Sequence, residues 1–205
     1  MMLKELLQSN YSTEQIAQSL LGKLLVHEKD GIRRSGFIVE TEAYLGVSDK
    51  AAHSYGGLRT KRTEIMFQEA GSIYTHIMHT HVLLNIITQP IGIPEGILIR
   101  AIEPYEGIPE MERARIRHGH NLTNGPGNLT KAMGIDMAYY GKNIFGNQLF
   151  IDENIEKQAI QIIATPRIGI PNKGEWTDKA LRFIVEGNPY VSKRKGSVAT
   201  DQGWL

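Results

Sequence analysis

Residues 36–53 read GFIVETEAYLGVSDKAAH, and this stretch predicts both a strand and a site. It opens with the β-forming run Phe37–Val39 and continues with strand character through Tyr44. Because side chains on a strand alternate between its two faces, Ile38, Glu40, Glu42 and Tyr44 share one face. Carboxylates are rarely buried without partners, so this face either meets solvent or forms a functional site.

The segments before this stretch predict a helix and a hairpin. Ser12 and Gln15 form a capping-box pattern, which indicates a helix that continues to about Leu21. Asp30-Gly31 is the strongest hairpin signal in the chain. We therefore expect residues 23–29 to pair antiparallel with residues 32–44, which places Glu42 near the end of the returning strand.

The segments after it predict further strands with few helices between them. Strand patterns cover residues 72–78, 83–88, 96–103, 159–164 and 181–185. Short helices are expected at 63–69, after Gly107, and after the turn Asn124-Gly125-Pro126-Gly127, where Pro126 suits a first helical turn. Scarce strand–helix–strand alternation favours an α+β class, with one domain over residues 1–205 around a largely antiparallel sheet.

Composition sets limits on the class of protein. The chain has 205 residues, 41% of them apolar, a net charge of +1 and no cysteine. Disulfides and thiolate metal sites are thereby excluded, and a cytoplasmic location is expected. No apolar run reaches the length of a signal peptide or of a membrane helix, so no membrane partner is expected. The bulk charge does not by itself indicate a nucleic-acid partner.

Four motifs together resemble the alkyladenine (3-methyladenine) DNA glycosylase family. They are the stretch 36–53, Arg59-Thr60-x-Arg62 with Met66-Phe67, LIRA-x-EP at 98–104, and NGPG at 124–127. The resemblance extends from about residue 13 to residue 192. It implies a compact domain with a curved antiparallel sheet, similar to the C-terminal domain of formyltransferases. It also implies a monomeric enzyme without metal or cofactor that removes damaged purines from double-stranded DNA by hydrolysis.

The resemblance assigns roles to individual residues. It implies that Glu42 activates water, that Arg100 holds that water and Glu42, and that the backbone carbonyl of Val185 also positions the water. It implies that Tyr44 and His53 stack on one face of the flipped base and that Asn85 excludes normal guanine by crowding its exocyclic amine. His76 and His79 fall where many family members have a pocket tyrosine and a wedge tyrosine, and Arg59 and Arg62 are candidate contacts to DNA phosphates.

The chemistry of these residue types agrees with the implied reaction. Cleavage of an N-glycosidic bond leaves oxocarbenium-like charge on the sugar, which a carboxylate both stabilises and supplies with a nucleophile. Extruding the nucleotide costs a few kcal/mol, and stacking on aromatic planes returns about 1–3 kcal/mol per base. Lesions such as 3-methyladenine, 7-methylguanine, hypoxanthine and ethenoadenine are the expected substrate class, and the sequence does not rank them.

Two other interpretations remain open from the sequence. His76, His79 and His81 with Glu40 or Glu42 provide the ligand types of a zinc site, which would suit a metal-dependent hydrolase. Only His79 and His81 share a strand face, so three ligands converge only if the chain bends. A non-catalytic nucleic-acid-binding module is the second alternative. Glu40 itself is expected to be the structural partner of a basic residue.

Overall fold

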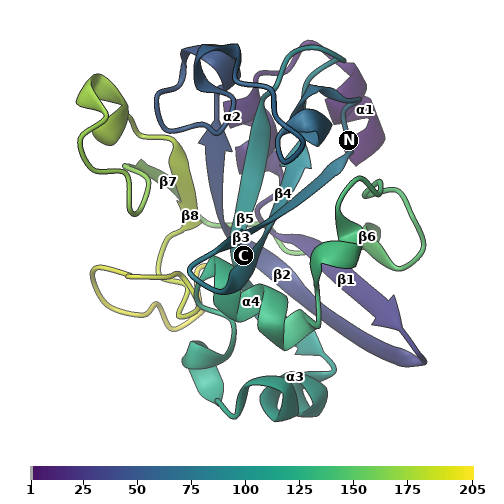
Figure 1. Ribbon diagram of the computed structural model, residues 1–205. Helices are drawn as coiled ribbons and strands as arrows, with labels where there is room; N and C mark the ends of the chain where they lie inside the picture. The colour runs from purple at the N-terminus through teal and green to yellow at the C-terminus, as the bar shows by residue number, and fades with distance from the viewer. Residues whose placement is uncertain (1) are drawn as a thin grey trace.

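Strand β2 (Ile32–Tyr44) lies at the centre of the sheet in this computed structural model, which describes residues 2–205 (Figure 1). Its first half pairs with β1 (Lys23–Lys29), and β5 (Gly96–Glu106) runs along its other side. The strand order is β3-β4-β5-β2-β1-β6. The last part of β2 pairs with β8, which also pairs with β7.

All of the paired strands run antiparallel, and the helices are short. The remaining strands are β3 (Ile73–Met78), β4 (His81–Ile87), β6 (Leu149–Glu156), β7 (Ile162–Thr165) and β8 (Arg182–Val185). The helices are α1 (Leu3–Gln8), α2 (Thr13–Ser19), α3 (Ile108–Arg115) and α4 (Pro126–Met133). The predicted α+β class is therefore confirmed.

Local signals in the sequence placed several elements correctly. Asp30 and Gly31 both have positive φ values, 54° and 71°, as a two-residue hairpin turn requires. The capping box of Ser12 and Gln15 is formed at the start of α2. Pro126 occupies the first turn of α4, where its missing N–H leaves no hydrogen bond unmade.

Other elements differ from the sequence predictions. Residues 63–69 contain only a 3₁₀ turn at Glu64–Phe67, and the strand predicted at 159–164 is the shorter β7. Strand β6 was not predicted, and its centre carries the polar run Asp152-Glu153-Asn154. This strand forms because it pairs with β1 at the sheet edge, a contact between segments far apart in the sequence.

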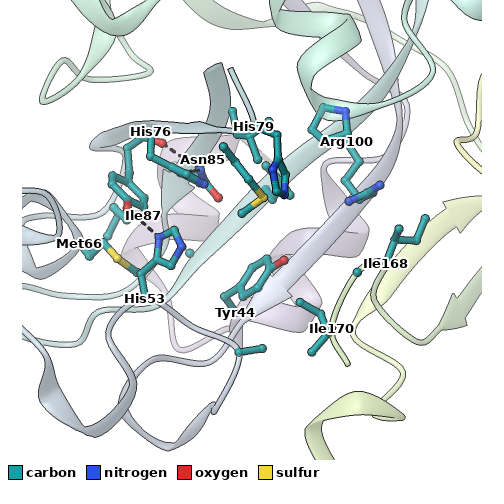
Figure 2. Close-up of a pocket in the computed structure, with 18 residues that line it drawn as sticks. Tyr44, His53, Met66, His76, His79, Asn85, Ile87, Arg100, Ile168 and Ile170 are labelled. Carbon is teal, nitrogen blue, oxygen red and sulfur yellow. Dashed lines mark hydrogen bonds between the residues drawn. The ribbon is translucent and has the colours of Figure 1, made fainter. Parts of the chain in front are cut away.

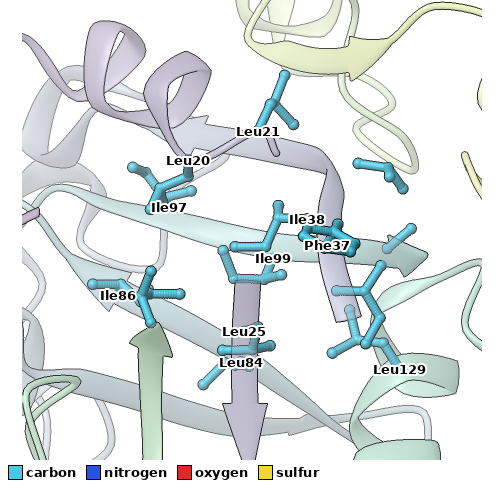
Figure 3. Close-up of a cluster of buried hydrophobic side chains, with 14 of the residues drawn as sticks. Leu20, Leu21, Leu25, Phe37, Ile38, Leu84, Ile86, Ile97, Ile99 and Leu129 are labelled. Carbon is cyan, nitrogen blue, oxygen red and sulfur yellow. The ribbon is translucent and has the colours of Figure 1, made fainter. Parts of the chain in front are cut away.

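One main apolar cluster extends from Leu3 to Trp204, so the described residues form a single compact domain. Its centre is made of aliphatic side chains that point from β1, β2, β4 and β5 (Figure 3). Fully burying each such side chain stabilises the fold by roughly 1.5–3 kcal/mol. Helix α2 packs on β2 and β5, and α4 packs on β4 and β5. None of the helices within residues 2–205 has the length and apolar character needed to cross a membrane.

A buried polar cluster joins the end of the chain to the sheet. Glu103 on β5 accepts hydrogen bonds from Asn188 Nδ2 (2.6 Å) and from the indole N–H of Trp204 (2.7 Å). The ammonium group of Lys157 completes its shell. Glu103 belongs to the LIRA-x-EP motif, and in the fold its carboxylate anchors the C-terminal segment.

Candidate active site

A cavity of about 270 Å³ lies beside the C-terminal end of β2, against β3, β4 and β5 (Figure 2). Its volume is near the lower end of the range of roughly 300–1,000 Å³ that is typical of small-molecule sites. The wall is mostly apolar and carries a few polar groups. The site residues predicted from sequence that line it are Tyr44, His53, His76, His79, Asn85 and Arg100.

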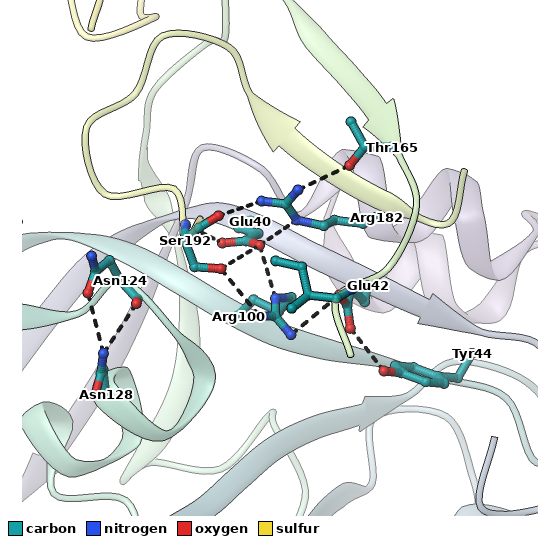
Figure 4. A network of polar contacts seen from close by, with 10 residues as sticks. Glu40, Glu42, Tyr44, Arg100, Asn124, Asn128, Thr165, Arg182 and Ser192 are labelled. Atoms are coloured by element: carbon teal, nitrogen blue, oxygen red, sulfur yellow. Dashed lines mark hydrogen bonds and ion pairs between the residues drawn. The ribbon is translucent and has the colours of Figure 1, made fainter. Parts of the chain in front are cut away.

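Glu42 lies directly behind this wall and is completely buried. Its carboxylate accepts hydrogen bonds from the Tyr44 hydroxyl (2.9 Å) and from the Ile168 backbone N–H (2.7 Å). Arg100 Nη1 lies 3.3 Å from the same carboxylate (Figure 4). Tyr44, Ile168 and Arg100, the three residues within 2–205 that contact the Glu42 carboxylate, all line the cavity.

Glu40 is also completely buried, but it belongs to a different network. Arg100 Nε (3.0 Å) and Arg182 Nε (2.6 Å) both donate to its carboxylate. Ser192 adds its backbone N–H (2.7 Å) and its hydroxyl (2.9 Å). Figure 4 shows Arg100 between the two glutamates. The prediction that Glu40 is the partner of a basic residue is confirmed, and the alternative that this strand face meets solvent is wrong.

Burial and the polar neighbours of Glu42 act on its pKa in opposite directions. Burial raises the pKa of Glu42 above its ordinary value, while Arg100, the Ile168 N–H and the Tyr44 hydroxyl partly offset that rise. Burial and the neighbouring Glu42 raise the pKa of Tyr44 well above its ordinary value. The phenol therefore stays protonated, and its O–H donates a hydrogen bond to Glu42. The arrangement suits a carboxylate that accepts a proton from a bound water molecule.

A second buried ion pair lies under Tyr44. Arg167 Nη1 and Nη2 lie 2.5 Å and 2.9 Å from the two oxygens of Asp49, and both side chains are fully buried. The Arg167 guanidinium also lies 4.6 Å from the centre of the Tyr44 ring. The pair holds the segment that carries Ile168 against the end of β2.

Three rings form the opposite side of the cavity. The Tyr74 and His76 rings stack with centroids 5.0 Å apart, and the His53 ring meets His76 edge-on at 4.7 Å. His53 Nδ1 is 2.8 Å from the Tyr74 hydroxyl. Burial lowers the pKa of His53, and it lowers the pKa of His76 to about 3, so His76 is neutral at physiological pH. Asn85 lies next to this group on β4.

The turn between β3 and β4 projects from the rim of the cavity. His79 and Thr80 occupy it with φ values of 47° and 73°, a left-handed conformation that non-glycine residues seldom adopt. Before them, Ile77 and Met78 expose 59% and 44% of their surface. Met78 and His79 also line the cavity, so the turn carries apolar and imidazole groups at its mouth.

The remaining predicted residues lie farther from Glu42. Arg59 is exposed and makes a two-point ion pair with Glu64, at 2.8 Å and 2.6 Å. The charge of Arg62 lowers the pKa of both His53 and His76, which places it near the ring cluster. Val185 does not lie beside Glu42, because Arg182 occupies the facing position on β8. The Val185 carbonyl accepts a hydrogen bond from Asn188 N–H (3.3 Å), in a turn outside the cavity.

The proposed metal ligands do not come together. Within residues 2–205, no three histidine, aspartate or glutamate side chains are arranged so that they could hold a metal ion. His76 is buried on β3, while His79 and His81 lie at or near the exposed turn. The histidine cluster therefore lacks the ligand set on which the metal-dependent alternative depended.

Sequence reasoning missed five residues that build the site: Asp49, Arg167, Ile168, Arg182 and Ser192. Asp49 lay within the stretch 36–53, but its partner comes 118 residues later. The only sequence signal for Arg167 and Ile168 was a basic residue followed by an apolar one. A single Arg-Ile pair is too common to indicate a site.

The fold and the cavity together define an enzyme-like site, a pocket walled by planar rings next to a buried carboxylate. Comparison with known proteins gives the family. A family model described as methylpurine-DNA glycosylase (MPG) matches residues 7–189. Proteins of Staphylococcus aureus strains JH9, Newman and JH1, each named "Putative 3-methyladenine DNA glycosylase", are 50% identical over 188 residues. That alignment covers 92% of this chain and 93% of each relative.

The chain therefore belongs to the methylpurine-DNA glycosylase family. It is a DNA glycosylase, a hydrolase of DNA repair, as the resemblance of its motifs implied.

Proposed function

We propose that this glycosylase removes alkylated and deaminated purines, of the 3-methyladenine, 7-methylguanine, hypoxanthine and ethenoadenine class, from duplex DNA. In this proposal, Glu42 activates the water that attacks the sugar carbon. The observation that carries it is the position of Glu42: a buried carboxylate held by three groups that all line the cavity.

The shell of Glu42 supports the role of base. Tyr44 and Ile168 fix the two carboxylate oxygens, so the carboxylate needs little rearrangement during the reaction. Arg100 is shared between Glu40 and Glu42, and its charge favours the ionised form of Glu42 against the effect of burial. The same negative charge would stabilise the oxocarbenium-like sugar as the base departs.

The rings of the cavity support binding of an extruded base. A purine placed between Tyr44 on one side and His53 and His76 on the other would stack on planar groups, each worth about 1–3 kcal/mol. This proposal puts His53 opposite Tyr44, whereas the resemblance implied that both lie on one face of the base. A flipped nucleotide is necessary because the glycosidic bond cannot be reached inside the duplex. In this proposal Asn85, which lines the cavity, crowds the exocyclic amine of normal guanine.

The β3–β4 turn supports the role of a wedge. His79 and its apolar neighbours Ile77 and Met78 project from the rim of the cavity, where they would enter the gap that the extruded base leaves. Arg62 would face nearby phosphates. Arg59 is committed to Glu64 and contributes less positive charge to this surface.

The composition of the cavity supports a single hydrolytic step without a covalent intermediate. None of the described residues that line the cavity is a lysine, so the wall offers no amine for a Schiff base with the sugar. The product would be an intact strand with an abasic site.

The proposal is tested with duplexes that each carry one lesion. Wild-type enzyme should produce alkali-labile breaks at the lesion only, and no species should be trapped by borohydride. Full activity after exhaustive chelation is expected. Loss of activity that zinc restores would overturn the metal-free mechanism, and absence of breaks in every lesion duplex would overturn the proposed substrate class.

A further inference from the structure

The orientation of the Asn85 amide is fixed by two neighbours. Its Nδ2 lies 3.0 Å from the Tyr74 backbone oxygen and 3.3 Å from His76 Nδ1. A backbone oxygen can only accept a hydrogen bond, so the atom that faces Tyr74 is the NH₂ group.

The same contact fixes the tautomer of His76. If Nδ1 carried the proton, its N–H would point at the N–H of Asn85, and two donors would face each other. Nδ1 is therefore the acceptor and Nε2 carries the proton. Nε2 is buried and, within the part of the chain that the structure describes, finds no hydrogen-bond partner.

Both amide hydrogens of Asn85 are thus engaged, and the oxygen is left over. Within residues 2–205, Asn85 Oδ1 receives no hydrogen bond, and it is not among the buried polar atoms that lack a partner. Asn85 lines the cavity, and Figure 2 shows its side chain directed into it. The cavity wall therefore presents a hydrogen-bond acceptor whose direction His76 and Tyr74 determine.

We propose that the His76–Asn85 pair makes Asn85 Oδ1 a fixed acceptor that selects purines with an N–H donor on their Watson–Crick edge. The inference rests on the proposed function, and it adds a chemical preference among its substrates. Hypoxanthine offers its N1–H, and 3-methyladenine offers its exocyclic amine. Normal guanine also has an N1–H, but its neighbouring 2-amino group would be crowded against Asn85, so the acceptor does not select guanine. In 1,N6-ethenoadenine the etheno bridge removes every N–H from that edge, so Oδ1 would be left unpaired against the bound base. An unpaired buried acceptor disfavours such a ligand.

The variant Asn85→Leu separates this acceptor role from a purely steric one. Leucine has nearly the shape of asparagine and still crowds the cavity wall, but it has no oxygen. Single-turnover base release is measured from two duplexes that differ only in hypoxanthine or ethenoadenine. We expect the ratio of hypoxanthine release to ethenoadenine release to fall by about tenfold, the size of one neutral hydrogen bond. An unchanged ratio in this variant overturns the proposal.

Two further variants test whether His76 holds the Asn85 amide and provide a control. His76→Phe keeps a ring for stacking but removes the acceptor that holds the amide, so the ratio should fall part of the way. Ile155→Ala changes an exposed side chain on β6 that does not line the cavity, and it should leave the ratio at its wild-type value. Because both lesions are measured with the same variant, a general loss of DNA binding cancels in the ratio.

A measurement on the wild-type enzyme tests the pair without any variant. The ¹⁵N shifts of the His76 ring report which nitrogen carries the proton, and we expect the Nε2–H tautomer. A ring with the proton on Nδ1 would overturn the inference, even if base release proceeded normally. Conversely, wild-type enzyme that releases no base from any lesion duplex would contradict the proposed function, while the tautomer result would still stand.

Discussion

Asp49 and Arg167 form a fully buried, two-point ion pair that joins the loop after β2 to the segment after β7. Arg167 Nη1 also donates to the Ala43 carbonyl (3.0 Å), and Leu45 and Ala51 donate their N–H groups to Asp49. Next to Arg167, Ile168 donates to Glu42. Through these buried contacts, the Asp49–Arg167 pair holds Ile168 and Tyr44 beside the Glu42 carboxylate.

Removing the charge of Asp49 should destabilise the fold strongly. Asp49→Asn leaves the Arg167 guanidinium buried without a counter-charge, and breaking a buried pair in this way costs about 3–5 kcal/mol. Urea unfolding measures the loss. The control is Glu64→Gln, which breaks the exposed pair with Arg59 and should barely move the midpoint. Equal midpoints for the two variants would contradict this account.

The two glutamates should respond differently to the same substitution. Glu42→Gln should keep the fold and binding to an abasic-site analogue but lower base release by about 10²-fold or more. Glu40→Gln should mainly lower stability, because two guanidiniums and Ser192 depend on its carboxylate. Single-turnover rates and unfolding curves measure both effects. Turnover of Glu42→Gln within tenfold of wild type would remove Glu42 from the mechanism.

The rate of base release should rise with pH as Glu42 ionises, which gives the pH–rate profile a rising limb. Burial raises the pKa of Glu42, so the limb should have its midpoint above the ordinary value of 4.5. 7-Methylguanine is the right lesion for this profile, because its positive charge lets it depart without a general acid. The carboxylate form is the active one, so the rate falls as pH decreases through the limb. A rate that is independent of pH down to 4.5 would place the base elsewhere.

His79→Ala should slow hypoxanthine release most in a well-paired duplex. If the imidazole fills the space that the base vacates, it offsets part of the cost of extrusion, and that cost is lower opposite a gap or in an unstable mismatch. Single-turnover rates of wild type and variant on both duplexes give two ratios. Equal ratios would show that His79 acts in the pocket or in the fold, and not as a wedge.

His27 should make the fold sensitive to acid. Its ring is buried, with Nδ1 2.6 Å from the Met133 carbonyl and Nε2 2.6 Å from the Tyr139 hydroxyl. Burial, followed by the charges of Arg34 and Lys29, lowers its pKa from 6.5, although the Met133 carbonyl and Asp136 act in the opposite direction. Below pH 6.5 the unfolded chain therefore takes up the proton before the folded chain does, and stability is lost as pH falls towards the folded pKa.

The test of His27 is the difference between two stability curves. His27→Phe should be less stable than wild type at pH 8, because Met133 and Tyr139 lose a partner, but its stability should fall less steeply between pH 6.5 and 5. His53 and His76 also have lowered pKa values and add the same slope to both proteins. Parallel curves would show that His27 does not titrate in this window.

Local sequence patterns predicted much of the fold and part of the candidate site. The hairpin at Asp30-Gly31, the capping box at Ser12 and the strand that presents Glu42 and Tyr44 depend on neighbours in the sequence. A turn or a strand face is set by the conformational preferences of a few consecutive residues, so a single sequence predicts it. The family motifs added Arg100, which the sheet places opposite the two glutamates.

The remaining contacts depend on which distant segments pack together. Val185 was assigned to the water site from its motif, but the register of β8 against β2 puts Arg182, and not Val185, opposite Glu42. Glu40 pairs with that arginine across 142 residues, and Asp49 pairs with Arg167 across 118. Such a contact leaves no periodicity in the sequence, because strand register and loop closure follow from packing of the whole core. The burial that changes the pKa of Glu42 arises in the same way, when segments far apart in the chain exclude water from a strand face that could otherwise have met solvent.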